Sequence, residues 1–153
     1  MSADTSGANA DLRLLIDGLE MLLRQVHPKC VTAGVPTSLA FRPSPKRDQG
    51  ELSVTLGSLT TPAEAFEHHT LSRHMESAGT WGLLVDDLTD HRVTVAAGRS
   101  MQAYAQAFED DPAHGFVDFR GMARGRCDAA GTILRTLALG HGCLYEPQQT
   151  QSS

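Results

Sequence analysis

Two basic side chains stand where the first strongly apolar segment of the chain meets a proline. Arg24 and His27 lie in the sequence RQVHP, and Pro28 prevents a helix from continuing past them. Arginine offers a planar fork of donors that suits phosphate and carboxylate groups. The sequence therefore predicts an anion-binding site formed by Arg24, Thr37, Ser38 and Arg42, with His27 as a candidate catalytic group. The alternative is that both side chains have only a structural role, because cations in a last helical turn complement the helix dipole.

The segment HGFVDF holds a second candidate for acid–base chemistry. His114 and Asp118 bracket a short expected strand that follows the acidic turn EDDP. An aspartate beside a histidine can fix its tautomer, which catalytic pairs require. We therefore predict His114 and Asp118 as catalytic candidates. The alternative is a turn histidine and a strand-end aspartate with no joint role.

The histidine-rich segment EAFEHHTLSRH raises the question of a metal. His68, His69 and His74 stand among glutamates, a composition that suits zinc. There is no HExxH motif, and on a regular helix His68 and His69 point in different directions. A solvated helix face is the favoured interpretation, so we assign no metal ligands. A metal-dependent hydrolase remains an alternative, and any cofactor is unknown.

The elements that must position these groups follow from hydrophobic periodicity and turn residues. We expect helices over 11–25, 60–77, 99–109 and 123–142, and strands around 38–41 and over 51–57, 80–88, 92–98 and 115–119. Thr61, Pro62 and Glu64 form a capping box at the second helix. This irregular order predicts a single α+β domain over residues 10–145, with a mainly antiparallel sheet of four to five strands and packed helices. Residues 1–9 and 146–153 have the composition of flexible tails.

Composition excludes several classes of protein. The chain has 153 residues, a formal net charge of -5, 41% hydrophobic and 20% charged residues. The negative charge argues against nucleic acid, and no apolar run is long enough to span a membrane. The three cysteines, Cys30, Cys127 and Cys143, form no CxxC pair and suggest a reducing, cytoplasmic compartment.

Five segments, RQVHP, GVPTSLAFRPSPK, ELSV, SAGTWGLLV and HGFVDF, together resemble a family of small bacterial proteins with no assigned function. The resemblance covers residues 22 to about 120 and implies no activity. The order of Arg24, of Ser53 in the LSV strand, and of Glu64 or Glu67 is similar to ADP-ribosyltransferase-like domains, including the NAD-degrading RES toxins. Here, AFRPSPKRDQG replaces the glycine- and tryptophan-rich segment of those domains, and no tyrosine stands beside the strand.

Three functions remain open from the sequence. The first is a small bacterial domain with a basic polar site for a phosphate- or nucleotide-like anion, and whether it is an enzyme is undecided. The second is a non-catalytic interaction module, an accessory or immunity-type subunit of a bacterial defence or toxin system. It would bind a protein partner, or a second copy of itself, through the leucines of the first expected helix. The third is the metal-dependent hydrolase.

Overall fold

The strand β5 (Glu51–Leu56) occupies the middle of the fold and shows why its sequence forms a strand. Leu52, Val54 and Leu56 alternate with polar residues and are all buried, whereas Ser53 is exposed. A tight turn with positive φ at Gln49 and Gly50 leads the chain into this strand. The computed structural model describes residues 12–44, 49–89, 93–96 and 99–147. The expected tail 1–9, and all of 146–153 beyond residue 147, lie outside the described residues.

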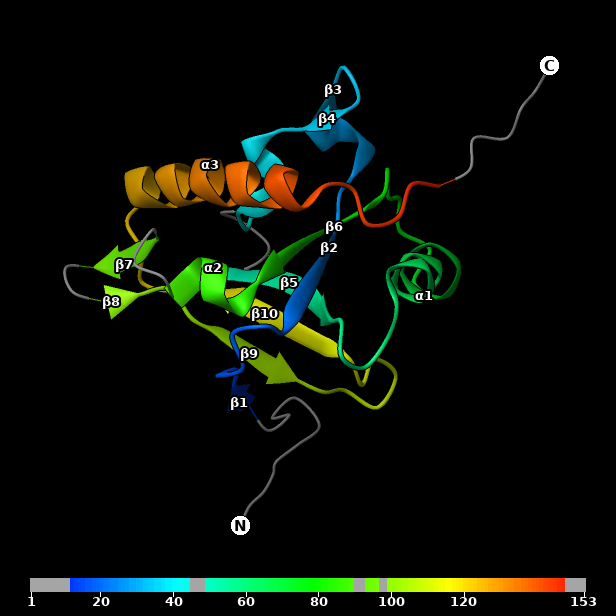
Figure 1. Cartoon of the computed structure of the whole chain (residues 1–153), viewed down its shortest axis with the longest axis horizontal. Helices are drawn as coiled ribbons and strands as arrows, with labels where there is room; N and C mark the ends of the chain where they lie inside the picture. The colour runs from blue at the N-terminus through cyan, green and yellow to red at the C-terminus, as the bar shows by residue number, and fades with distance from the viewer. Residues whose placement is uncertain (1–11, 45–48, 90–92, 97–98, 148–153) are drawn as a thin grey trace, which may run out of the picture.

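Six strands form one antiparallel sheet in the order β1-β9-β10-β5-β2-β6 (Figure 1). Besides β5, its strands are β1 (Leu12–Leu14), β2 (Met21–Gln25), β6 (Thr80–Leu84), β9 (Ala103–Gln106) and β10 (His114–Asp118). Two small hairpins stand outside it: β3 (Val31–Thr32) with β4 (Val35–Pro36), and β7 (Thr94–Ala96) with β8 (Arg99–Ser100). The expectation of a single α+β domain with a mainly antiparallel sheet is confirmed, and the sheet has six strands rather than four or five.

The long helix α3 (Arg124–His141) covers one face of the sheet (Figure 1). Its buried residues Ala130, Leu134 and Ala138 join the main hydrophobic core, which includes alternate residues of β2, β5 and β6. The 3₁₀ helix η2 (Ser38–Phe41) packs tightly against this helix, because Gly131 leaves room for the carbonyl of Ser38. Helix α2 (Val85–Thr89) continues directly from β6.

The helix α1 (Pro62–Glu67) lies beside the end of the sheet and carries the capping box expected from the sequence. Thr61 accepts a hydrogen bond from the Glu64 backbone amide at 3.1 Å, and Pro62 is in the first turn. The helix does not continue regularly to residue 77. It widens into a π-helix, η3 (His68–Ser72). The 3₁₀ helix η1 (Pro28–Cys30) follows the end of β2.

The prediction of a helix over residues 11–25 is wrong. The segment forms β1, a turn and β2, and the turn is closed by a hydrogen bond from the Glu20 amide to the Asp17 carbonyl at 3.0 Å. Gly18 lies against the side chain of Asp86, which would have to move to make room for a Cβ at this position. Leu22 and Leu23 are both buried because they lie on opposite faces of a central strand. A leucine-rich run of this length fits a buried strand as well as a helix.

Three further predicted elements differ from the structure. Residues 99–109 form β8 and β9 instead of a helix, because β9 is needed between β1 and β10. Residues 38–41 form η2 instead of a strand. The strand expected over 80–88 ends at Leu84, where the Asp87 carboxylate accepts a hydrogen bond from the Leu84 amide at 2.8 Å and starts α2.

Candidate functional site

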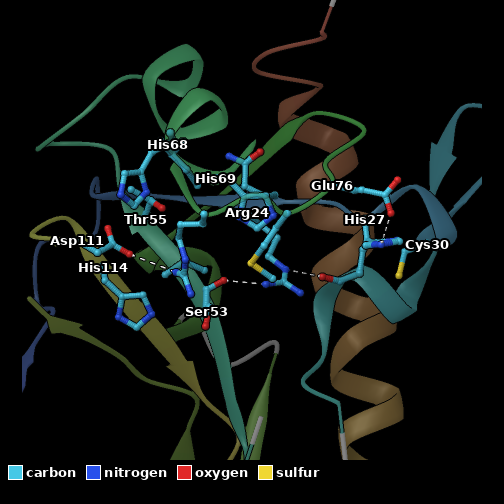
Figure 2. A pocket seen from close by; sticks show the side chains of 17 residues that line it. Arg24, His27, Cys30, Ser53, Thr55, His68, His69, Glu76, Asp111 and His114 are labelled. Carbon is cyan, nitrogen blue, oxygen red and sulfur yellow. Dashed lines mark hydrogen bonds and ion pairs between the residues drawn. The ribbon is translucent and has the colours of Figure 1, made fainter. Parts of the chain in front are cut away.

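The two central strands β2 and β5 separate where the candidate site begins. Their pairing is limited to Leu22 with Leu56 and Leu23 with Thr55, while β2 stays paired with β6 as far as Gln25. The Arg24 side chain enters the opening between the strands (Figure 2). Its Nε donates to the Ala40 carbonyl at 2.8 Å and its Nη1 to the Ser53 carbonyl at 2.9 Å. Arg24 therefore ties η2 to the part of β5 that β2 has left.

A hollow of about 220 Å³ opens at this separation (Figure 2). Its charged and titratable lining residues come from β2 and the segment after it, from η3 and the segment after it, and from the β9–β10 connection and the start of β10. They are Arg24, His27, Cys30, His68, His69, Arg73, Glu76, Asp111 and His114. Ser53 and Thr55 of β5 add hydroxyl groups. This combination provides guanidinium donors, several imidazoles and only two carboxylates within one concave site.

Three of the seven residues predicted as catalytic or ligand-binding groups meet in this hollow. Arg24, His27 and His114 all line it, although they belong to separate elements. Arg24 and His27 were predicted to project from the end of a helix, and that helix does not form, because Arg24 lies in the strand β2. His27 is extended, as expected for a residue before proline.

The other predicted ligand-binding residues do not line this hollow. Arg42 forms an ion pair with Asp128 of α3 at 2.9 Å. Thr37 and Ser38 stand at the start of η2, and the buried Thr37 hydroxyl has no hydrogen-bond partner within the described part of the chain. Ser38 and Arg42 lie against Gly131 of α3 and so pack η2 against that helix.

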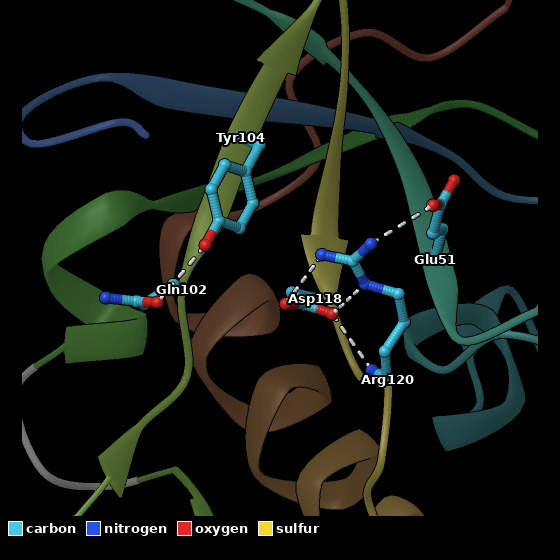
Figure 3. Close-up of polar contacts among 5 residues, drawn as sticks. All are labelled: Glu51, Gln102, Tyr104, Asp118 and Arg120. Carbon is cyan, nitrogen blue, oxygen red and sulfur yellow. Dashed lines mark hydrogen bonds and ion pairs between the residues drawn. The ribbon is translucent and has the colours of Figure 1, made fainter. Parts of the chain in front are cut away.

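Asp118 does not line the hollow either, and it contacts Arg120 instead (Figure 3). It ends β10, roughly 13 Å along the strand from His114 at the usual rise per residue. Its carboxylate accepts hydrogen bonds from Arg120 Nε at 2.9 Å and Nη2 at 3.2 Å. This interaction raises the pKa of Arg120, whose guanidinium also stands over the Phe116 ring. The Asp118–Arg120 pair lies at the C-terminal end of β10, so Asp118 does not orient His114.

His114 has a defined tautomer all the same. Its Nδ1 stands 3.3 Å from the Gln106 carbonyl, which can only accept, so Nδ1 carries the proton and Nε2 keeps a lone pair. Burial lowers the pKa of His114, and the nearby negative charge of Asp111 opposes that shift. A neutral imidazole with a fixed lone pair can accept a proton from a hydroxyl or a water molecule.

His27 is held in the opposite tautomer. Its Nδ1 accepts a hydrogen bond from the Lys29 backbone amide at 3.0 Å, and its Nε2 lies 3.2 Å from the Glu76 carboxylate. Both nitrogens are engaged, so His27 holds the rim of the hollow together. A catalytic role for His27 would require one of these contacts to break.

His68, His69 and Arg73 are site residues that the sequence did not single out as binding groups. The π-helix brings the adjacent histidines to the same hollow, because its wider turn bonds the Arg73 amide to the His68 carbonyl five residues earlier. Burial lowers the pKa of His69, a hydrogen bond to the Glu76 backbone opposes that shift, and the charge of Arg24 adds to it. π-helical turns concentrate at functional sites, but no sequence rule announces one.

The residues of the ADP-ribosyltransferase-like pattern are only partly brought together. Ser53 is in contact with Arg24 in the hollow. Glu64 caps α1, and Glu67 is exposed on the same helix without lining the hollow. No group of three or more histidine, cysteine, aspartate or glutamate side chains within the described ranges is arranged to hold a metal ion.

Comparisons with protein-family models, curated proteins and solved structures found no match to this chain. The resemblances noted in the sequence therefore stay untested. Within the described residues, no helix has the length and apolar character needed to cross a bilayer. The geometry of the hollow is thus the basis for a functional proposal.

Proposed function

We propose that the hollow between β2 and β5 binds a small ligand carrying a phosphate- or nucleotide-like anionic group. The observation that carries this proposal is the meeting of Arg24, Arg73 and four imidazoles around one concave site. Guanidinium groups are donors that suit phosphate oxygens, because they are always charged and offer several N–H groups in a planar fork. The residues come from distant parts of the chain, so their meeting is a property of the fold.

The two arginines contribute differently to this proposal. Arg24 is a rigid cation, since two backbone carbonyls hold its guanidinium in place. Arg73 is half-exposed, and its Nη1 stands 3.6 Å from the Asp111 carboxylate, a loose pair. Because the Arg73 side chain is 49% exposed, its other guanidinium N–H groups can donate to a phosphate oxygen while Nη1 stays near Asp111.

His114 gives the proposed site the means to act on its ligand. Its Nε2 lone pair belongs to a group that burial keeps neutral at physiological pH. Proton transfer from a ligand hydroxyl or a water molecule to this nitrogen is the step that an enzyme built on this site would use. Binding and proton transfer are separable, so a binding domain without catalysis also satisfies the proposal.

The test is calorimetric titration with inorganic phosphate and AMP. Arg73→Gln should weaken AMP binding at least tenfold, by about 1.4 kcal/mol or more, because a charge-assisted contact is lost. Arg13→Gln is the matched control, since Arg13 is exposed on β1 and does not line the hollow. Failure of both ligands to bind the unmodified protein, or equal weakening by the two variants, would refute the proposal.

An interaction module is the second candidate, and a specific surface favours it. Leu12, Leu14, Ile16 and Leu19 are exposed on β1 and the turn after it, and Ile16 is 86% exposed. Clustered apolar side chains on a surface favour association with another protein. Light scattering after size-exclusion chromatography tests association between copies. If Ile16→Ser with Leu19→Ser leaves a dimer intact, this surface does not form it.

A further inference from the structure

A second hollow of about 320 Å³ adjoins the first. Thr55, Ala65, His68 and Asp111 line both, so the two hollows share a wall. Figure 2 shows His68, Thr55 and Asp111 close together at the side of the first hollow. The wall is held by His68 Nε2, which donates to the Asp110 carbonyl at 3.1 Å, and by the loose pair of Arg73 with Asp111.

The second hollow has a different chemistry from the first. Neither arginine of the first hollow lines it, and His68 is its one basic lining residue within the described part of the chain. Its acceptors are carboxylates and hydroxyls, and its apolar lining includes Leu59, Pro112 and Ala113. The acceptors are Glu64, Asp110, Asp111, Thr55 and Thr60. Carboxylates there repel a second anion and accept hydrogen bonds from hydroxyl groups, while the apolar side chains pack on a ring.

We infer that the second hollow binds the uncharged, hydroxylated part of the ligand whose phosphate occupies the first. This inference rests on the proposed function and narrows it to the phosphomonoester of a sugar, either free or within a nucleotide. The shared wall fixes the orientation: the phosphate lies near Arg24 and Arg73, and the sugar hydroxyls lie toward Glu64 and Asp110.

Calorimetry with four probes tests the ligand class. Inorganic phosphate, ribose, ribose 5-phosphate and AMP are titrated into the full chain under the same buffer conditions. We expect ribose 5-phosphate to bind at least tenfold more tightly than phosphate, and ribose alone to bind weakest. Tighter binding of AMP than of ribose 5-phosphate identifies a nucleotide ligand, and the reverse order identifies a free sugar phosphate. Both orders support the inference.

Substitutions in the second hollow test whether the tighter binding of ribose 5-phosphate arises there. Asp110→Asn removes a carboxylate acceptor but leaves the backbone carbonyl that holds His68, and Leu59→Glu adds a charge at a side chain that is 61% exposed. Each should lower the preference for ribose 5-phosphate over phosphate at least fivefold and leave phosphate binding unchanged. Leu39→Glu, on η2 and outside both hollows, is the control for an added surface charge.

Two failures have different meanings. If phosphate binds but ribose 5-phosphate binds no tighter, or if the two variants keep the full preference, this inference is overturned and the anion site stands. If phosphate, ribose 5-phosphate and AMP all fail to bind, the proposed function falls and this inference falls with it. Urea denaturation of each variant verifies that binding changes do not follow from unfolding.

Discussion

Arg24 stabilises the fold in addition to its proposed role in ligand binding. Its guanidinium satisfies the carbonyls of Ala40 and Ser53 at the point where β2 leaves β5. Arg24→Met removes both donors and leaves these carbonyls without them, so the free energy of unfolding should fall by about 3 kcal/mol. Urea denaturation measures the change. Arg13→Met, on the exposed edge strand, should change it by less than about 0.5 kcal/mol, and a similar loss in both variants would contradict this reading of Arg24.

The buried histidines of the hollow make stability depend on pH. The pKa of His114 is lowered in the folded protein, so the unfolded chain binds more protons just below pH 6.5. The stability contributed by neutral His114 is therefore complete above that pH and is lost as the pH falls through the folded pKa. His69 acts in the same direction.

His114→Gln should reduce the drop in melting temperature between pH 7 and pH 5, since glutamine carries no titratable proton. Differential scanning fluorimetry across this range measures the drop, and most carboxylates stay ionised within it. His74→Asn is the control, because His74 is exposed, lies outside the hollow and has a positive φ that asparagine tolerates. An unchanged drop in His114→Gln would show that burial of this ring is not the cause.

Part of the site could be predicted from residue types and part could not. His27 precedes a proline, His114 follows the acidic turn EDDP, and Arg24 stands four residues before the same proline; all three line the hollow. Arg42 has the same local signal, yet its carboxylate partner Asp128 lies on a helix far along the chain. Pairing between distant segments is decided by the fold, so residue type alone did not separate these arginines.

At the scale of elements, local signals succeeded where their physical cause is local. The capping box of α1 and the alternation of β5 are readable from a few neighbouring residues, and both elements formed. The π-helix η3 and the strand β9 depend on distant partners, and neither was expected. The aspartate and glycine at residues 17 and 18 are a turn signal that the leucines around them concealed.

The exposure of two apolar side chains distinguishes the observed strand, turn and strand over residues 11–25 from the predicted helix. In the structure, Ile16 is 86% and Leu19 is 77% exposed, whereas the predicted helix placed both in its apolar stripe. Ile16→Ser and Leu19→Ser should each change the free energy of unfolding by less than about 0.5 kcal/mol. Leu134→Ala, in the fully buried contact of α3 with the sheet, should cost about 3 kcal/mol. Urea denaturation compares them, and a loss above 2 kcal/mol in either serine variant would favour the helix.

At the scale of the whole molecule, the class of fold was predictable and the order of the sheet was not. The mixed order of helical and strand patterns favoured an α+β domain because it lacks a regular βαβ repeat. The sheet order joins β1 to β9, with Leu12 opposite Gln106, which no local pattern specifies. The separation of β2 from β5, and with it the hollow, depends on that global arrangement.

The sheet order also determines which strands should open first. β5 lies between β10 and β2, whereas β1 is an edge strand of three exposed residues. The opposite edge strand, β6, is protected by the segment after α3, since the Thr80 amide donates to the Tyr145 carbonyl at 2.9 Å and the Leu144 amide to the Thr80 carbonyl at 2.8 Å. Hydrogen exchange followed by mass spectrometry should show amides of β1 exchanging fastest, those of β6 intermediate, and those of β5 and β10 slowest. Equal protection of β1 and β5 would mean that another chain covers the β1 edge, which would support the interaction module over an isolated binding domain.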